Sequence, residues 1–332
     1  MQLPSHTLVG AAAKLSTVTP SPVLSFSPVV IPSQDRLVDL QLRISVPSTI
    51  TTRTDNDKDN RLPVVLLSHG HGRSNWLSSL DGYAPLYEFW AAHGLAVIQP
   101  THQGSAFLGL NDTSGNMFFE ARAEDMLRIL DHTDEIEAAF PAIKGRLNWD
   151  RVAVAGHSFG AWTTSMVLGA DNKDPRDGTI VSIPQHRSIR AGVIMAGTGR
   201  GGDDLSENGC NMVPFYGPDF SKMRTPALVV VGDEDVSPYL TVRGADWHAD
   251  PYTLAPGPKH LFTLRGGHHG LGGVSGWDAA ENAQDESPER LGAVQRVTLA
   301  YLRSQLYEGD ESWAKVCEEL KGLEQLGNVQ SK

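Results

Sequence analysis

Apolar residues follow two different patterns along the chain. Between residues 38 and 46 they alternate with polar residues, which indicates a strand with one wet face at an antiparallel edge of a sheet. From residue 64 onward they form short continuous runs, which are typical of strands buried on both faces of a parallel sheet. Six such runs occur, at residues 64–68, 95–99, 152–156, 191–197, 227–232 and 260–266.

Segments with helical periodicity lie between these runs. In residues 120–140, Met126 and Ile129 belong to an apolar stripe that lies opposite Glu124 and Arg128. Because strands and helices alternate, the sequence predicts an α/β fold, with a doubly wound, mostly parallel sheet and an antiparallel N-terminal strand. Further helices are predicted at residues 83–93, 159–169 and about 288–307.

Composition divides the chain into one large domain and two flanking segments. Residues 1–34 are rich in Ser, Thr and Pro, and we expect a loosely ordered N-terminal arm. Residues 35–310 form the predicted domain, with a polar hairpin or loop at 51–60, and residues 311–332 are expected to form a helical tail. Residues 198–224, rich in Gly, Asp, Asn and Pro, interrupt the alternation and are expected to form a lid-like excursion above the strand ends.

Charge and hydropathy narrow the classes of partner. The chain has 28 Lys and Arg against 39 Asp and Glu, a net charge of -11, so its surface repels phosphate backbones and no nucleic-acid partner is expected. No apolar run approaches the ~20 residues that a membrane helix needs. The stretch LVGAAAKL is short, is interrupted by Lys14 and has no basic residue before it, so we expect a cytoplasmic location, with secretion as the alternative.

The sequence GHSFG, residues 156–160, places a serine where an apolar run passes into a helical segment. A serine at such a corner adopts a strained backbone conformation that lifts its hydroxyl clear of the sheet. Gly156 and Gly160 lack Cβ atoms, so strand and helix can pass close together. The amide of Phe159 begins the helix, where free N–H groups favour a developing negative charge. This pattern predicts Ser158 as a nucleophile.

A nucleophilic serine needs a base, and the base needs a carboxylate to orient it. Two later loops supply both kinds of residue. The loop GDEDVSP follows the fifth apolar run and contains Asp233 and Asp235, and the loop GGHHG follows the sixth and contains His268 and His269. The order serine, acid, histidine along the chain is the one that this strand arrangement requires.

With these motifs the chain resembles the α/β-hydrolases, and within them the branch of chlorophyllases, platelet-activating-factor acetylhydrolases and polyester-degrading cutinases. The resemblance covers roughly residues 38–305. It implies Asp235 as the acid, because the family's Gly-x-x-Asp is followed by a proline three residues on, and His269 as the base, from its Gly-x-x-His. The stretch LLSHGHGRS resembles the family's His-Gly loop, which implies that the amides of His71 and Phe159 form an oxyanion hole.

Several assignments have alternatives. Asp233 is a second candidate for the acid, and Asp203 and Asp204 follow the preceding strand, where some lipases keep theirs. His268 is a second candidate for the base, and otherwise a candidate substrate-binding residue beside the site. His102 is a further substrate-binding candidate because its loop lies at the strand-end face, although a structural role fits its position equally well.

Histidine pairs also raise the question of a metal. His69 and His71 form His-x-His, and His268 directly precedes His269. A metallohydrolase needs three or four ligands with an open coordination position. The Asp-His pair that usually follows such a His-x-His is missing here, and the His-Gly loop explains the motif, so no metal and no cofactor are expected.

The expected function is cleavage of a carboxylic ester through an acyl-enzyme on Ser158, with Asp235 and His269 completing a triad. The expected partner is a small-molecule ester with an apolar part. A serine triad serves esters, thioesters, amides and lactones alike, so the bond type rests on the resemblance. The alternative is a member of the same fold that binds a ligand without turnover or transfers acyl groups without hydrolysis.

Overall fold

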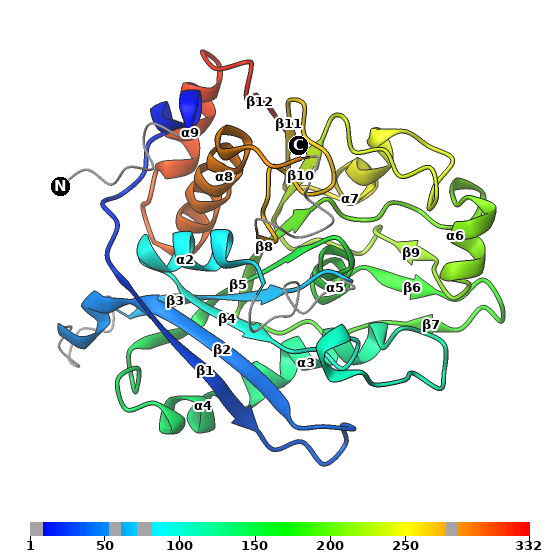
Figure 1. Cartoon of the computed structure of the whole chain (residues 1–332), viewed down its shortest axis with the longest axis horizontal. Helices are drawn as coiled ribbons and strands as arrows, with labels where there is room; N and C mark the ends of the chain where they lie inside the picture. Colours follow the sequence, from blue (N-terminus) through cyan, green and yellow to red (C-terminus); the bar gives the residue numbers. More distant parts are fainter. Residues whose placement is uncertain (1–8, 53–60, 72–81, 277–284) are drawn as a thin grey trace.

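A computed structural model describes residues 9–52, 61–71, 82–276 and 285–332 of the chain. These residues form a mixed α/β structure around one large sheet, most of whose strand pairs are parallel (Figure 1). The described strands of this sheet lie in the order β1-β2-β4-β3-β5-β8-β10-β11-β12. The predicted α/β class with a mostly parallel sheet is therefore confirmed.

The centre of the sheet consists of parallel strands that are buried on both faces. All side chains of β3 and β10 are buried, as continuous apolar runs predict. Each of the six predicted runs overlaps one of these strands. In spatial order the central strands are β4 (Ala96–Pro100), β3 (Leu62–Ser68), β5 (Leu147–His157), β8 (Ile189–Met195), β10 (Ala227–Gly232) and β11 (Lys259–Leu264).

Antiparallel strands complete both ends of the sheet. At one end β2 (Leu40–Pro47) pairs with both β4 and β1 (Val23–Ile31), so the strand predicted at the edge lies one position inside it. At the other end β12 (Gly327–Ser331) pairs with β11. The predicted helical tail is thus a helix, α9 (Ser312–Leu320), followed by a short polar strand that satisfies the open edge of β11.

The N-terminal segment differs from the expected loosely ordered arm because it contains β1. Val29 and Ile31 of this strand are buried in the core. Pro28 lies where the pairing with β2 shifts register, between Phe26 and Val29. Since proline cannot donate to a strand ladder, an edge strand with such an irregularity is where it is tolerated. The Ser- and Pro-rich composition did not indicate this strand, which is stabilised by burial of its apolar residues.

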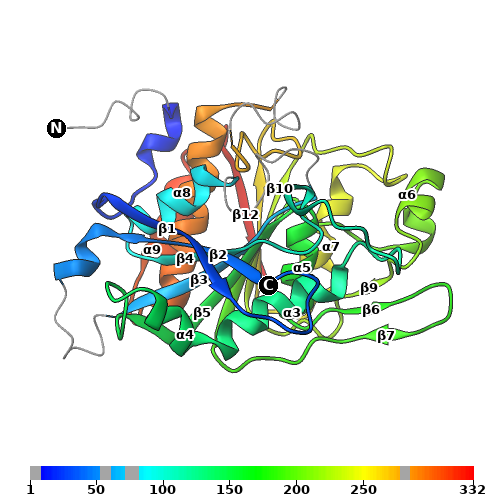
Figure 2. The same cartoon turned by 60° about the horizontal axis from the view of Figure 1, so that its bottom comes forward.

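Helices cover both faces of the sheet (Figures 1 and 2). The helix predicted at residues 120–140 is divided in two at His132, whose backbone leaves the helical region with φ -117° and ψ 31°. Each face has its own cluster of buried apolar side chains. The helices on one face are α2 (Ala84–Ala92), α8 (Pro288–Leu306) and α9, and those on the other are α3 (Phe119–Asp131), α4 (Thr133–Ala139) and α5 (Phe159–Val167).

Residues 198–224 leave the alternation of strand and helix, as predicted for an excursion. They contain only short elements, among them α6 (Glu207–Met212) and β9 (Pro218–Asp219). β9 pairs with β6 (Asp171–Lys173) in a small antiparallel sheet that also includes β7 (Ile180–Val181). Of the polar segment predicted at 51–60, residues 53–60 lie outside the described ranges. Among the described helices none is long and apolar enough to cross a membrane.

Candidate active site

Ser158 lies at the corner between β5 and α5 in a strained conformation. Its φ of 56° and ψ of -122° are unfavourable for a residue with a side chain. A Cβ atom added to Gly156 would lie 2.0 Å from the carbonyl oxygen of Gly160, and one added to Gly160 would lie 2.2 Å from that of Ser68. Both glycines are therefore required for the close approach of β5, α5 and β3 that holds the serine in this conformation.

His269 connects Ser158 with Asp235. Its Nε2 lies 2.9 Å from Ser158 Oγ, and its Nδ1 lies 3.0 Å from Asp235 Oδ2. The three residues follow β5, β10 and β11, and parallel strands bring their carboxyl ends to the same edge of the sheet. A hydroxyl, an imidazole and a carboxylate thus form one hydrogen-bonded chain, an arrangement that can take a proton from the serine.

The charge of Asp235 is set by its surroundings. The side chain is 1% exposed, and this burial alone would raise the pKa of Asp235. The imidazoles of His269 and His248 outweigh that effect and hold the pKa of Asp235 well below its usual value. The carboxylate is therefore ionised and accepts a hydrogen bond from His269 Nδ1, which leaves the lone pair of Nε2 facing Ser158.

His248, which the sequence analysis did not single out, is a third imidazole in this region. It belongs to η7 (Ala245–Ala249), and its side chain is 1% exposed. Its Nδ1 lies 2.6 Å from the carbonyl oxygen of Gly197, and because a carbonyl only accepts, this nitrogen carries the proton. Its Nε2 lies 3.3 Å from Asp235 Oδ1 without the geometry of a hydrogen bond. No motif in the surrounding sequence marks this histidine.

The alternative acids have other partners. Asp233 pairs with Arg265 at 3.0 Å and accepts a hydrogen bond from the backbone N–H of Gly266. Asp204 pairs with Arg243 at 2.9 Å. Asp203, in η6 (Gly202–Asp204), is exposed. Asp235 is thus the predicted acid that the structure brings to His269.

The two histidines predicted to bind substrate do not line the cavity beside Ser158. His102 is 0% exposed, its Nδ1 donating to Asp125 Oδ2 at 2.9 Å and its Nε2 accepting from Ser68 Oγ at 2.9 Å. His268 is 45% exposed, and its two ring nitrogens lie 3.0 and 3.3 Å from the backbone and side-chain oxygens of Glu234. His102 is held by a buried cluster and His268 by a surface pair, so neither occupies its expected place.

The buried cluster around His102 lies at the ends of β3 and β4, on one side of β5, whereas Asp235 and His269 lie on the other side. Asp125 also pairs with Arg36 at 2.8 Å, and both side chains are almost fully buried. Burial lowers the pKa of His102 well below its usual value, so its ring is neutral. His69, adjacent to this cluster, donates from Nδ1 to Gly70 O and accepts from the His102 N–H, which occupies both of its nitrogens.

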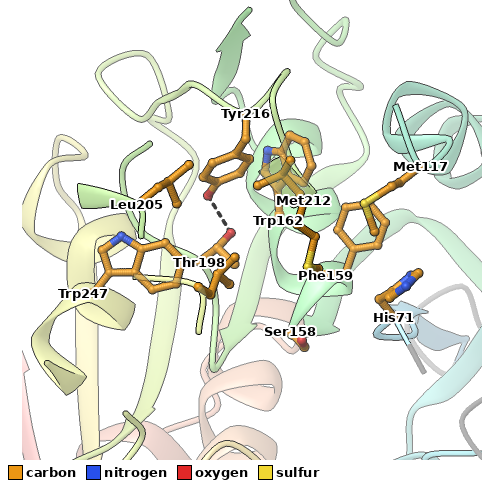
Figure 3. Close-up of a pocket in the computed structure, with 12 residues that line it drawn as sticks. His71, Met117, Ser158, Phe159, Trp162, Thr198, Leu205, Met212, Tyr216 and Trp247 are labelled. Carbon is orange, nitrogen blue, oxygen red and sulfur yellow. Dashed lines mark hydrogen bonds between the residues drawn. The ribbon is translucent and has the colours of Figure 1, made fainter. Parts of the chain in front are cut away.

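A cavity of about 150 Å³ opens beside Ser158 (Figure 3). Ser158, Phe159 and His71 lie together at one end of it, and the predicted excursion at 198–224 forms much of its wall. Space of this size holds a group about as large as benzene. The remaining lining is mainly apolar and consists of Met117, Trp162, Thr198, Leu205, Met212, Val213, Tyr216, Leu240 and Trp247.

The residues predicted to form the oxyanion hole meet at this end of the cavity. Phe159 is the first residue of α5, where a backbone N–H has no partner within the helix. The rings of His71 and Phe159 are edge to face, with centroids 5.9 Å apart. The buried guanidinium of Arg122 lies 4.5 Å above the Phe159 ring and donates to the carbonyl oxygen of His69, which supports the loop that carries His71.

His157 connects the loop that carries His71 with the loop that carries His269 through hydrogen bonds. The hydroxyl of Tyr83 accepts from the Gly70 N–H at 3.0 Å and donates to His157 Nδ1 at 2.9 Å. The Nε2 of His157 donates to the carbonyl oxygen of His269 at 2.7 Å. Burial, reinforced by the charge of His269, lowers the pKa of His157 to about 3, so the ring is neutral. Every donor in this chain of hydrogen bonds therefore faces an acceptor.

Potential metal ligands gather at a different place from the His-x-His pair considered in the sequence. In the described part of the chain, donor atoms of Asp235, His248 and His269 lie within 4.8 Å of one another.

Comparison with known proteins assigns no family: no protein-family model matches the sequence, and no curated protein matches it significantly. The functional argument for this chain therefore rests on its own geometry.

Proposed function

We propose that this protein is a serine hydrolase of the α/β-hydrolase fold, which cleaves a carboxylic ester through an acyl-enzyme on Ser158. The observation that carries the proposal is the hydrogen-bonded chain from Ser158 through His269 to Asp235. The strained serine at a strand-to-helix corner and the order of the three residues along the chain support the fold assignment.

In the first step Ser158 Oγ attacks the ester carbonyl carbon while His269 Nε2 accepts the hydroxyl proton. Asp235 stabilises the imidazolium that forms. The carbonyl oxygen gains a negative charge, which the backbone amides of His71 and Phe159 stabilise by hydrogen bonding. The tetrahedral intermediate then collapses: the bond to the alcohol oxygen breaks, and His269 returns the proton to that oxygen, which leaves as the free alcohol.

In the second step a water molecule attacks the acyl carbon of the ester on Ser158, and His269 accepts the proton of the water. Collapse of the second intermediate breaks the bond to Ser158 Oγ, which regains its proton from His269 as the carboxylic acid leaves. His269 acts as base and acid in both steps, so a single imidazole suffices.

The cavity supports an ester with an apolar group of limited size. Its lining is mainly apolar, and its volume of about 150 Å³ is that of a group such as benzene. We therefore expect the highest kcat/KM for acyl or aryl groups of roughly four to six carbons. The cytoplasmic location expected from the N-terminal sequence stays a prediction.

The test combines a covalent probe with an ester series. The full chain is expected to react with a fluorophosphonate and to hydrolyse p-nitrophenyl esters from acetate to octanoate, and Ser158→Ala is expected to abolish labelling and to lower kcat by about 10⁴–10⁶-fold. Ser165→Ala is the matched control, because this buried serine of α5 donates only to the carbonyl oxygen of Ala161.

Labelling that survives in Ser158→Ala contradicts the proposal. If no ester of the series is cleaved while a ligand still binds in the cavity, the protein is a binding member of the fold. If the ester is consumed but the acyl group passes to an added alcohol rather than to water, the protein is an acyltransferase.

A further inference from the structure

His248 and Asp235 approach each other in a way that ordinary hydrogen bonding does not explain. His248 Nδ1 donates to the carbonyl oxygen of Gly197, which leaves Nε2 as the ring nitrogen that can bind a ligand. That nitrogen is buried and lies 3.3 Å from Asp235 Oδ1, an acceptor, and within the described ranges no residue forms a hydrogen bond with it. A buried imidazole nitrogen and a carboxylate oxygen at this distance can act together as ligands of one metal ion.

The three side chains offer a recognised ligand set for a transition metal. Two imidazoles and one carboxylate bind Zn²⁺, with metal-to-ligand distances of about 2.0–2.2 Å, so that ligand atoms of a tetrahedral site lie about 3.4 Å apart. The separations of Asp235 from His248 and from His269 are 3.3 and 3.0 Å, and all three donor atoms lie within 4.8 Å of one another.

The second ring nitrogen of His248 supplies independent support. A histidine that binds a metal almost always donates its other N–H to a carbonyl or carboxylate, which fixes the ring and its tautomer. His248 does so through its 2.6 Å hydrogen bond to Gly197. His269, with a side chain 34% exposed, is the member of the cluster that solvent reaches, so a hydrated ion arrives past its ring.

From these contacts we propose that Asp235, His248 and His269 form an inhibitory site for Zn²⁺ or a similar divalent transition metal. The ion binds His248 Nε2, an oxygen of Asp235 and His269 Nδ1, and water completes a tetrahedron. To bind, His269 moves its single ring proton from Nδ1 to Nε2, with solvent as carrier, so no net proton is released and no electron is transferred.

The metal inhibits because it selects the wrong tautomer of His269. Nε2, which accepts the proton of Ser158 in the proposed reaction, then carries a proton of its own. The metal also removes Asp235 from its contact with Nδ1. This inhibition rests on the proposed function, whereas binding of the metal does not, and the two are tested separately.

Binding is measured on the metal-free full chain by calorimetric titration with Zn²⁺ and by the visible absorption of tetrahedral Co²⁺. We expect one saturable site in the wild type. His248→Gln is expected to weaken Zn²⁺ binding at least about tenfold and to remove the Co²⁺ band. His269→Gln, at a partly exposed position that tolerates change, is expected to have the same effect and covers the case in which the buried His248→Gln variant does not fold.

The matched control is His268→Gln, which removes the neighbouring exposed imidazole and is expected to leave Zn²⁺ affinity unchanged. Mg²⁺ at equal concentration is expected not to compete, because it prefers oxygen ligands in octahedral geometry. The inference is overturned by an absence of saturable binding up to about 1 mM Zn²⁺, by an affinity that His248→Gln leaves unchanged, or by displacement of Zn²⁺ with Mg²⁺.

Inhibition is measured as the rate of ester hydrolysis with and without Zn²⁺, each variant relative to its own metal-free rate. The wild type and His268→Gln are expected to be inhibited over the range in which they bind Zn²⁺, and His248→Gln to need at least about tenfold more. Metal binding that depends on His248 in a protein without esterase activity would refute the proposed function and retain the site. Esterase activity without such binding would support the proposed function and refute the metal site.

Discussion

Two buried histidine–carboxylate clusters flank Ser158, and they differ in how their hydrogen bonds are completed. At the ends of β3 and β4, His102 donates to Asp125 and accepts from Ser68, so both ring nitrogens have complementary partners. At the ends of β10 and β11, Asp235 lies between His269 and His248, and the second of these faces it without a hydrogen bond. The first cluster is closed to solvent, whereas the ring of His269 is partly exposed.

The difference indicates what each cluster contributes. Groups that are buried, paired and balanced between donors and acceptors hold the chain in place. Groups that keep a lone pair available and reach solvent retain the capacity to accept a proton or bind a ligand. We therefore expect changes in the cluster of Asp125 to affect mainly stability and changes in the cluster of Asp235 to affect mainly activity.

Among changes within the two clusters, the largest expected effect is that of Asp235→Asn on turnover. The amide of asparagine donates to His269 Nδ1, which favours the tautomer with its proton on Nε2, and kcat is expected to fall by about 10⁴-fold. The free energy of unfolding is expected to change by less than about 1 kcal/mol, because asparagine has the same shape. Ester hydrolysis and urea denaturation measure the two quantities.

The control for this variant is Asp233→Asn, a change on the same loop in a residue that pairs with Arg265. It is expected to alter kcat by less than about threefold, in line with a surface ion pair. A larger loss of kcat in Asp233→Asn than in Asp235→Asn would show that Asp233, and not Asp235, is the acid.

Sequence patterns were sufficient for the central sheet and for bringing together Ser158, Asp235 and His269. Continuous apolar runs mark strands buried on both faces, and the loops after them must meet at one edge, so Asp235 and His269 followed from strand order and from the resemblance. The strand β1 was missed because its pattern is interrupted by Pro28 at a register shift. Only its pairing with β2 makes that segment a strand.

The residues that sequence reasoning missed act through contacts distant along the chain. His248 lies in a segment without a motif. It becomes a candidate functional residue only through its contacts with Gly197 and Asp235, which are distant in sequence and are brought to it by folding. Arg122 and Asp125 had a weak signal, since they are charged residues one helical turn from the buried Met126 and Ile129, on the apolar side of α3. A charge on the buried face of a helix is the pattern that indicates a buried ion pair.

The next largest effect is expected for Asp125→Ala on stability. The substitution leaves Arg36 and His102 buried without their carboxylate, which is expected to cost about 3–5 kcal/mol of unfolding free energy in urea. Asp131→Ala, which removes an exposed carboxylate from the same helix, is the control and is expected to cost less than about 0.5 kcal/mol. If Asp125→Ala instead lowered kcat of the folded protein as much as Asp235→Asn, the division of roles between the clusters would be wrong.

The smallest expected effect is a change in how stability depends on pH. It tests whether His157, like His102, is a buried neutral ring whose two nitrogens both have complementary hydrogen-bond partners. Its pKa is lowered to about 3 in the folded protein, against about 6.5 for an unfolded chain. Between these values only the unfolded state binds the proton, so stability falls as the pH falls from about 6.5 toward 3. From pH 7 to pH 5 this group alone is expected to cost about 2 kcal/mol.

His157→Gln removes this titration while keeping one acceptor for Tyr83 and one donor for the carbonyl oxygen of His269. Urea denaturation at pH 7 and pH 5 is therefore expected to show a loss about 2 kcal/mol smaller in the variant than in the wild type. Since His69 and His102 titrate alike in both proteins, the difference isolates His157. Equal losses would mean that the His157 ring takes up a proton in the folded state, and that solvent reaches the hydrogen bonds which join the two loops beside Ser158.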